Sequence, residues 1–244
     1  MHHAQGTTRK YNTHDCPTSI YGSITIHMMV IGMTLLDEET KKALKEKFEK
    51  ELVNDVELIG VIGGREDFKD FEEFTENLLN ELSELDDRIK VKIVGPDDEL
   101  AKKYEVEMTP TILIQPEDYD IRYSGAPAGE EGWGFVESLI AASKRDSGLS
   151  EKAREMLKDL KEKKHIRVFI TPTCPYCPQA VLLANRIAIE VPKVVRSECV
   201  EAYENEELSN RFNVASVPMQ VINDKPTSIG AQPELKFVKE VLTA

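Results

Sequence analysis

The sequence predicts an α/β protein in which one folding unit occurs twice in tandem. Apolar runs typical of buried strands alternate with segments of helical periodicity, and the order of these elements in residues 33–146 recurs in residues 147–244. In each unit we expect a central mixed sheet flanked by helices, in the order helix, strand, helix, strand, helix, strand, strand, helix. We call residues 33–146 the first unit and residues 147–244 the second unit, and a chain of 244 residues is long enough for both.

The first unit opens with a helix and a buried strand. Leu44, Phe48 and Leu52 recur at helical spacing. The apolar run at residues 56–62 ends at two glycines, as expected for a parallel strand covered on both faces. The later elements follow from the same patterns: a helix with apolar positions from Phe68 to Leu82, a strand at 89–94, a short helix at 97–104, strands at 111–114 and 121–123, and a helix at 133–143.

A polar linker at residues 144–150 leads into the second unit. Ile166, Val168 and Ile170 alternate with other residues as in a short buried strand, and Pro172 ends this strand because proline has no N–H to donate. The other expected elements are a helix at 153–160, a helix at 174–190, a strand at 193–200, a short helix at 205–212, a strand at 219–222 and a helix at 233–242.

Short landmarks support the duplication. Pro110 and Pro218 each precede the strand of corresponding position in their unit. These two prolines are 218 − 110 = 108 residues apart, and carrying Cys174 back by this offset lands near a segment that begins with Phe68 and ends with Phe71. The spacing of the two positions is therefore kept in the first unit, while two phenylalanines stand where the second unit has two cysteines.

Cys174 and Cys177 form a Cys-Pro-Tyr-Cys motif between an expected strand and an expected helix. Free N–H groups and the positive end of the helix dipole favour a thiolate at such a helix start, and the thiolate is the reactive form of cysteine. We therefore expect Cys174 to be exposed at the turn and to attack a disulfide as the nucleophile. Cys177, one helical turn further in and shielded from outside reagents, should then resolve the mixed disulfide. Pro175 and Pro178 suit a first helical turn, where an N–H has no partner in the helix.

A Cys-x-x-Cys pair is also half of many zinc sites, and this is the main alternative for the motif. The other half requires two more Cys or His residues at short spacing. The remaining candidates are Cys16, Cys199 and five histidines, none of which is paired at such a spacing. The sequence therefore favours a redox pair and no metal. We interpret Cys16 as incidental and Cys199 as a small buried apolar residue.

The composition restricts the classes of partner and compartment. A formal net charge of −13 argues against nucleic acid as a partner, because phosphate binding requires a basic face. With 41% hydrophobic and 31% charged residues, the chain should fold as a soluble globule. Four cysteines in 244 residues do not form the disulfide framework of a secreted domain, so we expect a cytoplasmic protein.

Residues 1–32 do not match the rest of the chain. Residues 1–20 are polar without periodicity, and the apolar stretch at 23–36 is too short to span a bilayer. No small-residue cleavage site of a signal peptide follows this stretch. We interpret residues 1–32 as a disordered extension or as the product of a start codon placed too early, with Met33 as the better start, and expect no membrane association.

The chain resembles the thioredoxin and glutaredoxin superfamily. The run of residues 171–178, Thr-Pro-Thr-Cys-Pro-Tyr-Cys-Pro, the later proline before a strand and the duplicated unit carry this resemblance. More narrowly, residues 33–244 resemble the archaeal glutaredoxin-like protein disulfide oxidoreductases, which have two thioredoxin folds in tandem. Many of these proteins carry Cys-x-x-Cys in each half. The resemblance therefore implies an active second domain, a degenerate first domain and a redox-active disulfide in place of a bound cofactor.

The resemblance also assigns residues around the motif. It implies that Pro218 is a cis proline beside the dithiol and that the backbone of Val217 pairs with an extended substrate segment as an added strand. Pro175 and Tyr176 are further expected substrate contacts.

The resemblance leaves open the role of the first domain and the identity of one catalytic residue. Pro110, with Phe68 and Phe71, marks the degenerate first site. Thioredoxins use a buried acid that shuttles protons for the resolving cysteine, and no residue of this sequence can be assigned to that role, since Glu190 lies at the far end of its helix.

The function that the resemblance implies is reduction or exchange of protein disulfides in cell redox homeostasis, with an NAD(P)H-dependent flavoprotein as the electron donor. One alternative is an electron relay, because the amino-terminal part of bacterial alkyl hydroperoxide reductase flavoproteins is also a tandem thioredoxin fold with its dithiol in the second half. A flavoprotein would then reduce this chain and a peroxiredoxin would receive the electrons. Glutathione is a third possible partner, since Cys-Pro-Tyr-Cys is common among glutaredoxins. An alternative of another class is a non-catalytic scaffold that binds peptides, which requires Phe68 or Phe71 to be exposed.

Overall fold

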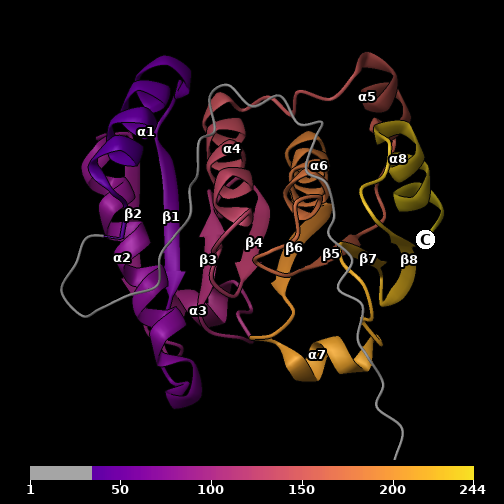
Figure 1. Cartoon of the computed structure of the whole chain (residues 1–244). Coiled ribbons are helices and arrows are strands. Elements are labelled where there is room, and N and C mark those ends of the chain that lie inside the picture. Colours follow the sequence, from indigo (N-terminus) through magenta and orange to yellow (C-terminus); the bar gives the residue numbers. More distant parts are fainter. Residues whose placement is uncertain (1–34) are drawn as a thin grey trace, which may run out of the picture.

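The computed structural model of this protein describes residues 35–244. The expected extension at residues 1–32, including Cys16, lies outside the described residues. The described part of the chain forms one sheet with helices packed against it (Figure 1).

Eight strands form one continuous sheet in the order β2-β1-β3-β4-β6-β5-β7-β8 (Figure 1). In each unit the first strand pairs in parallel with the second and antiparallel with the third, and the third pairs antiparallel with the fourth. This confirms the expected repeat of the mixed sheet. The strands are β1 (Val56–Val61), β2 (Ile89–Val94), β3 (Thr111–Ile114), β4 (Asp120–Ser124), β5 (Lys164–Ile170), β6 (Val195–Glu201), β7 (Met219–Ile222) and β8 (Lys225–Ile229).

The helices cover the two faces of the sheet unequally. The main core on one face includes side chains from α1, α2, α4, α5, α6 and α8. Two small clusters, around Leu113 and around Phe169, lie on the other face beside α3 and α7. The helices are α1 (Glu38–Glu51), α2 (Lys69–Leu85), α3 (Glu99–Lys103), α4 (Glu131–Lys144), α5 (Glu151–Leu157), α6 (Cys177–Glu190), α7 (Glu206–Arg211) and α8 (Glu234–Thr243), with a single 3-10 turn η1 (Glu66–Phe68) before α2.

Some element boundaries differ from the expected ones. The helix expected from Cys174 begins at Cys177, because the preceding residues form a turn. The strand expected from Lys193 begins at Val195, since Lys193 has a φ of 62°, which does not fit a strand. The helix expected from Phe68 is preceded by the 3-10 turn η1.

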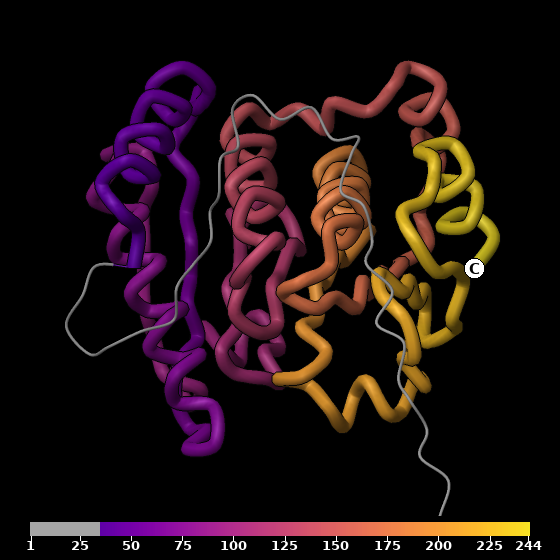
Figure 2. The backbone as a smooth tube through the Cα atoms, viewed as in Figure 1, coloured from indigo at the N-terminus to yellow at the C-terminus, as the bar shows by residue number. Residues whose placement is uncertain are grey.

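The two units share one core, which the sequence did not predict. Their sheets join where β4 pairs in parallel with β6, and α4 and α6 lie side by side over this seam (Figure 2). At this seam Asn185 of α6 donates to the hydroxyls of Tyr123 in β4 and Ser138 in α4 at 3.2 and 2.9 Å. Its carbonyl oxygen accepts from the Ser197 hydroxyl at 2.6 Å. These four side chains are buried, so a polar network as well as the shared sheet connects the two units.

Candidate active site

The dithiol motif lies in the connection between β5 and α6. β5 ends at Ile170, and the Cys174 N–H donates to the Thr171 carbonyl oxygen at 3.1 Å, which closes a tight turn. Pro172 occupies the second position of this turn, where the fixed φ of proline is favourable. α6 then begins at Cys177, whose N–H donates to the Cys174 carbonyl oxygen at 3.3 Å. The sequence thus places one cysteine in the turn and the other at the start of the helix.

Cys174 and Cys177 form a disulfide with their Cα atoms 5.5 Å apart. Cys177 is fully buried, as the sequence predicts for a resolving thiol. Cys174 is also largely covered, at 7% exposed, so the expectation of an exposed Cys174 is wrong for this disulfide form. Of the two cysteines, Cys174 is nevertheless the more exposed, which fits attack from outside at this residue.

Val217 and Pro218 lie beside the turn. The antiparallel register pairs Phe169 of β5 with Met219 of β7, so the residues before Met219 reach the end of β5, where the turn begins. The Val217–Pro218 peptide bond is cis, as is the Thr109–Pro110 bond of the first unit. The Pro218 carbonyl oxygen accepts from the Gly230 N–H at 2.8 Å.

Exposed apolar side chains lie on segments near the dithiol. Of the four large hydrophobic residues that are exposed in the described part of the chain, three belong to segments near the dithiol. Tyr176 lies inside the motif, Tyr203 follows the Ala202 N–H that donates to Ile170 at 2.9 Å, and Ile229 precedes Gly230. Tyr176 was expected from the sequence, whereas Tyr203 and Ile229 were not, although an aromatic residue among acidic neighbours in Glu201-Ala-Tyr-Glu is a usable signal. Pro175 is exposed as well.

Glu131, the first residue of α4, is a buried acid that the sequence did not single out. Its side chain is 1% exposed, and neither carboxylate oxygen has a hydrogen-bond partner among the described residues. Burial raises the pKa of Glu131 well above its usual value, which favours the protonated form of this group in the disulfide state. Glu131 Oε1 and the Cβ of Pro178 lie 2.8 and 2.9 Å from the position that a Cβ on Gly134 would take. The carboxyl group therefore lies close to the first turn of α6, which begins with Cys177.

Two further carboxyl groups are buried at the end of β6. Glu201 and Glu204 are 3% and 1% exposed, and each has one oxygen without a partner in the described residues. Burial raises the pKa of Glu204 to about 7, although the Ala126 N–H donates to it at 2.8 Å and acts in the opposite direction. Burial also raises the pKa of Glu201. Glu204 thus holds the start of the loop that leads from β4 to Glu131, and Glu201 accepts from the Glu204 N–H at 2.6 Å.

Cys199 is a buried free thiol in β6. Burial raises the pKa of this thiol well above its usual value, and the neighbouring Glu131 acts in the same direction. A buried, neutral thiol is inert, which agrees with the interpretation of Cys199 as a small apolar residue.

The degenerate site of the first unit is filled by its own chain. Phe68 and Phe71 are half-buried with ring centroids 6.2 Å apart, and Phe71 packs against the main core. The Arg65 guanidinium lies 3.8 Å from the Phe68 ring centroid and donates to the Thr109 carbonyl oxygen at 3.1 Å. The backbone acceptor that precedes Pro110 is therefore occupied by Arg65.

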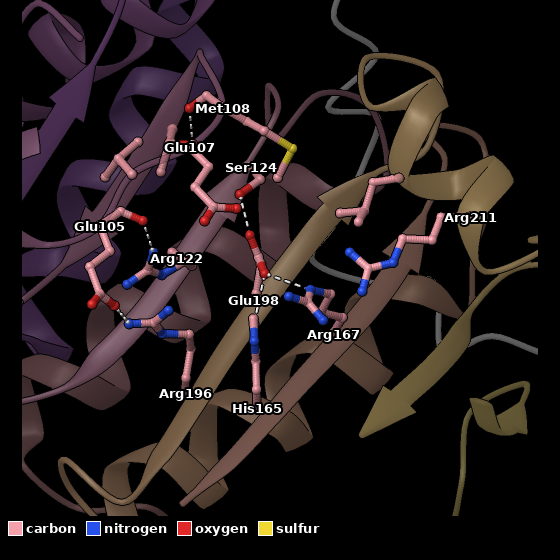
Figure 3. Close-up of a pocket in the computed structure, with 13 residues that line it drawn as sticks. Glu105, Glu107, Met108, Arg122, Ser124, His165, Arg167, Arg196, Glu198 and Arg211 are labelled. Atoms are coloured by element: carbon pink, nitrogen blue, oxygen red, sulfur yellow. Dashed lines mark hydrogen bonds and ion pairs between the residues drawn. The ribbon is translucent and has the colours of Figure 1, made fainter. Parts of the chain in front are cut away.

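A pocket of about 120 Å³ lies on the opposite face of the seam, and Figure 3 shows its charged lining. Glu198 is at its centre and accepts from Ser124, His165 and Arg167 at 2.7, 2.7 and 3.1 Å. Burial by itself raises the pKa of Glu198, but the hydrogen bond and charge of His165, with Ser124 and Arg167, outweigh this and hold it at about 2. Glu198 of β6 thus binds Ser124 of β4 and His165 and Arg167 of β5, so this cluster connects the three strands.

Residues 35–244 contain neither a candidate metal site nor a candidate membrane-spanning helix. No group of three or more His, Cys, Asp or Glu side chains within these residues could hold a metal ion. Among the helices described, none has the length and apolar character needed to cross a membrane.

Comparison with known proteins places the chain among disulfide-exchanging proteins. Residues 164–243 match the family model described as a thioredoxin domain. The structure is similar to a protein disulfide oxidoreductase from Aeropyrum pernix, with a TM-score of 0.77 and 33% identity, over 84% of this chain and 91% of that one. A thioredoxin from Methanocaldococcus jannaschii is 32% identical over 76 residues, which cover 31% of this chain and 89% of the relative.

Longer relatives match only in part. An alkyl hydroperoxide reductase of Staphylococcus aureus is 25% identical over 185 residues, which cover 75% of this chain and 34% of that protein. The match to an NADH dehydrogenase from Bacillus subtilis spans 26% of that protein. This chain thus corresponds to about a third or less of these two proteins.

Proposed function

Because this chain belongs to the thioredoxin superfamily and is built like its tandem protein disulfide oxidoreductases, we propose that it is a thiol–disulfide oxidoreductase that reduces or exchanges protein disulfides through Cys174 and Cys177. The observation that carries the proposal is the disulfide itself, placed between β5 and the start of α6 with the deeper sulfur fully buried. The two sulfurs carry both electrons, so the reaction requires no bound metal or organic cofactor.

In the proposed reaction the Cys174 thiolate attacks one sulfur of a substrate disulfide. The substrate S–S bond breaks, the other substrate sulfur leaves as a thiolate and takes up a proton, and a mixed disulfide forms with Cys174. Cys177 then loses its proton and attacks the Cys174 sulfur, which releases the reduced substrate and restores the disulfide of the oxidoreductase. A donor that supplies two electrons and two protons returns the pair to the dithiol.

Glu131 is the proposed proton acceptor for Cys177. Its raised pKa brings the carboxyl group closer to a thiol in acidity, and a smaller difference makes proton transfer between the two easier. The carboxyl group has no other partner among the described residues and lies close to Pro178, next to Cys177. Glu131 takes the proton during resolution, directly or through one water, and returns it when the disulfide is reduced.

The proposed substrate is an extended protein segment. The Val217 backbone offers the strand-pairing contact beside the turn, and exposed Pro175, Tyr176, Tyr203 and Ile229 provide an apolar surface around it.

We also propose domain limits, a cellular compartment and an electron donor for this protein. The domain limits that we propose are residues 33–146 and 147–244, with catalysis in the second. The proposed compartment is the cytoplasm, and the proposed donor is an NAD(P)H-dependent flavoprotein.

A relay function is the second candidate. The match to the alkyl hydroperoxide reductase covers 75% of this chain, which supports transfer of electrons from a flavoprotein to a peroxiredoxin. The scaffold alternative has less support, because Phe68 and Phe71 are half-buried and Arg65 occupies the Thr109 carbonyl oxygen.

The test is reduction of insulin disulfides by dithiothreitol, with the parent compared with Cys174→Ser and Cys177→Ser. We expect the parent to accelerate the reaction and both variants to lose the effect. Cys177→Ser should in addition accumulate a mixed disulfide at Cys174, visible by mass spectrometry. A parent that does not exceed the uncatalysed rate, with both thiols still titratable, would overturn general disulfide reduction and favour the dedicated relay.

A further inference from the structure

The loop after β4 contacts the dithiol turn from the first unit. The Glu130 N–H donates to the Pro172 carbonyl oxygen at 2.8 Å. Gly129 has a φ of 62°, and a Cβ on Gly129 would overlap the same carbonyl oxygen. The backbone of the first unit therefore approaches the turn so closely that no side chain fits between them.

This contact fixes one peptide plane of the turn. Pro172 is the second residue of the turn closed by Thr171 and Cys174. The direction of the carbonyl group at this position distinguishes the two common turn types, which differ by a flip of the central peptide plane. The Glu130 N–H of the first unit therefore fixes the orientation of the peptide plane that follows Pro172 in the turn leading to Cys174.

A second contact holds the other flank of the motif. Gly134 is one helical turn further along α4, and a Cβ at Gly134 would lie 2.9 Å from the Cβ of Pro178 and 3.2 Å from its Cα. α4 and α6 can approach this closely only because Gly134 has no side chain. Pro178 directly follows Cys177, so this contact sets the start of α6.

We propose that Gly129, Glu130 and Gly134 are positioning residues for the dithiol, through which the first unit holds both flanks of the Cys-Pro-Tyr-Cys motif. In the reduced protein, these contacts keep Cys174 aligned with the free N–H groups at the start of α6, where its thiolate is stabilised. The first unit has lost its own cysteines but retains a part in the reaction of the second. This inference rests on the proposed function of Cys174 as the nucleophile.

The test compares two pairs of variants in the full chain. Glu130→Pro removes the N–H that Pro172 accepts, and the φ of −60° at Glu130 already suits proline. Its control, Glu130→Ala, keeps the N–H and removes only an exposed side chain. Gly134→Ala introduces a clash with Pro178 and also with the Glu131 carboxyl group, whereas Glu130→Pro does not add an atom at this position. The control for Gly134→Ala is Gly132→Ala, which adds a Cβ in the same helical turn whose nearest neighbour is 3.7 Å away.

The main readout is the rate at which iodoacetamide alkylates Cys174 in the reduced protein between pH 4 and pH 9, with the label located by peptide mass spectrometry. We expect the profiles of Glu130→Pro and Gly134→Ala to move to higher pH, which slows alkylation about tenfold on the low-pH side of the profile if the displacement is one pH unit. We expect both controls to follow the parent profile. The exchange equilibrium with glutathione should change in the same two variants.

The outcomes separate this inference from the proposed function. If both test variants only unfold at lower temperature and keep the profiles of their controls, the contacts merely stabilise the fold and the inference is wrong. Should Gly134→Ala fail to fold, Glu130→Pro decides the question through the same profile. A parent that fails to reduce insulin would overturn the proposed function, while the alkylation profiles would still decide whether the first unit positions Cys174.

Discussion

The side-chain amide of Asn185 in α6 donates to the hydroxyl of Tyr123 in β4 at 3.2 Å, across the seam between the two units. Both side chains are buried, and Asn185 also accepts from Ser197. We predict that Asn185→Ala lowers the free energy of unfolding by about 2 to 4 kcal/mol, because buried hydroxyl groups lose their partner. Denaturant unfolding of this variant and of Asn80→Ala, which removes an exposed side chain in α2, measures the difference. Equal stabilities would contradict the structural importance of the network.

The raised pKa of Glu204 predicts a pH dependence of stability. The pKa is about 7 in the folded protein against 4.5 for the unperturbed group. The folded state therefore keeps its proton at a pH where the unfolded state has released it. The contribution to stability is complete below about pH 4.5 and is lost as the pH rises towards 7, with a total of about 3 kcal/mol.

The variant Glu204→Gln isolates this contribution. Its amide oxygen can still accept from the Ala126 N–H, but it does not titrate. We expect the difference in unfolding free energy between parent and variant to change in favour of the variant as the pH rises from 4.5 to 7.5. A difference that stays constant across this interval would show that Glu204 does not titrate as proposed. Because Glu201 and Glu131 also have raised pKa values, only the difference between the two proteins is informative.

The repeat and the redox motif were predictable from sequence because both depend on local patterns. The strands of each unit follow from apolar runs, and the cysteine spacing fixes Cys174 and Cys177 within one turn. The joining of β4 and β6 was not predictable in this way, since each unit reads as a complete sheet and no local pattern states which edges will pair.

Glu131 could not be found from sequence for a related reason. It lies in the first unit, in a stretch rich in glycine and acidic residues that looks solvent-exposed, and the cysteine that we propose it serves is in the second unit. Its neighbour Glu130 is indeed exposed, while Glu131 is buried. The exposed Glu130 and the buried Glu131 are distinguished only by the packing of α4 on α6. Tyr203 and Ile229 were missed because their proximity to the dithiol depends on the pairing of distant strands.

Tyr203 should contribute to the binding of protein substrates and not to the sulfur chemistry. It is 71% exposed beside the end of β5. We predict that Tyr203→Ala lowers kcat/KM for insulin about fivefold or more, the effect of losing over 1 kcal/mol of interface energy. Reaction with a small aromatic disulfide should be unchanged. Val53→Ala, which removes exposed apolar atoms at the opposite end of the sheet, is the control. An equal loss with both disulfides would instead assign Tyr203 to the dithiol itself.

Glu131→Gln should slow the resolving step and leave the first attack intact. The amide keeps the size of the buried side chain but cannot exchange a proton with Cys177, and general acid–base groups contribute about 100-fold or more to such steps. Under single-turnover conditions we expect the mixed disulfide at Cys174 to form at the parent rate and to decay more slowly. Glu207→Gln, an exposed change in α7, should match the parent.

The pH dependence separates proton transfer from a structural effect of Glu131→Gln. If Glu131 accepts the proton of Cys177, the variant should recover at high pH, where solvent hydroxide removes that proton and the buried carboxylate is no longer needed. A defect of the same size at pH 6 and pH 9 would mean that the carboxyl group acts through packing. In that case replacement by leucine, which removes an unpartnered buried acid, should raise the free energy of unfolding without any further loss of rate.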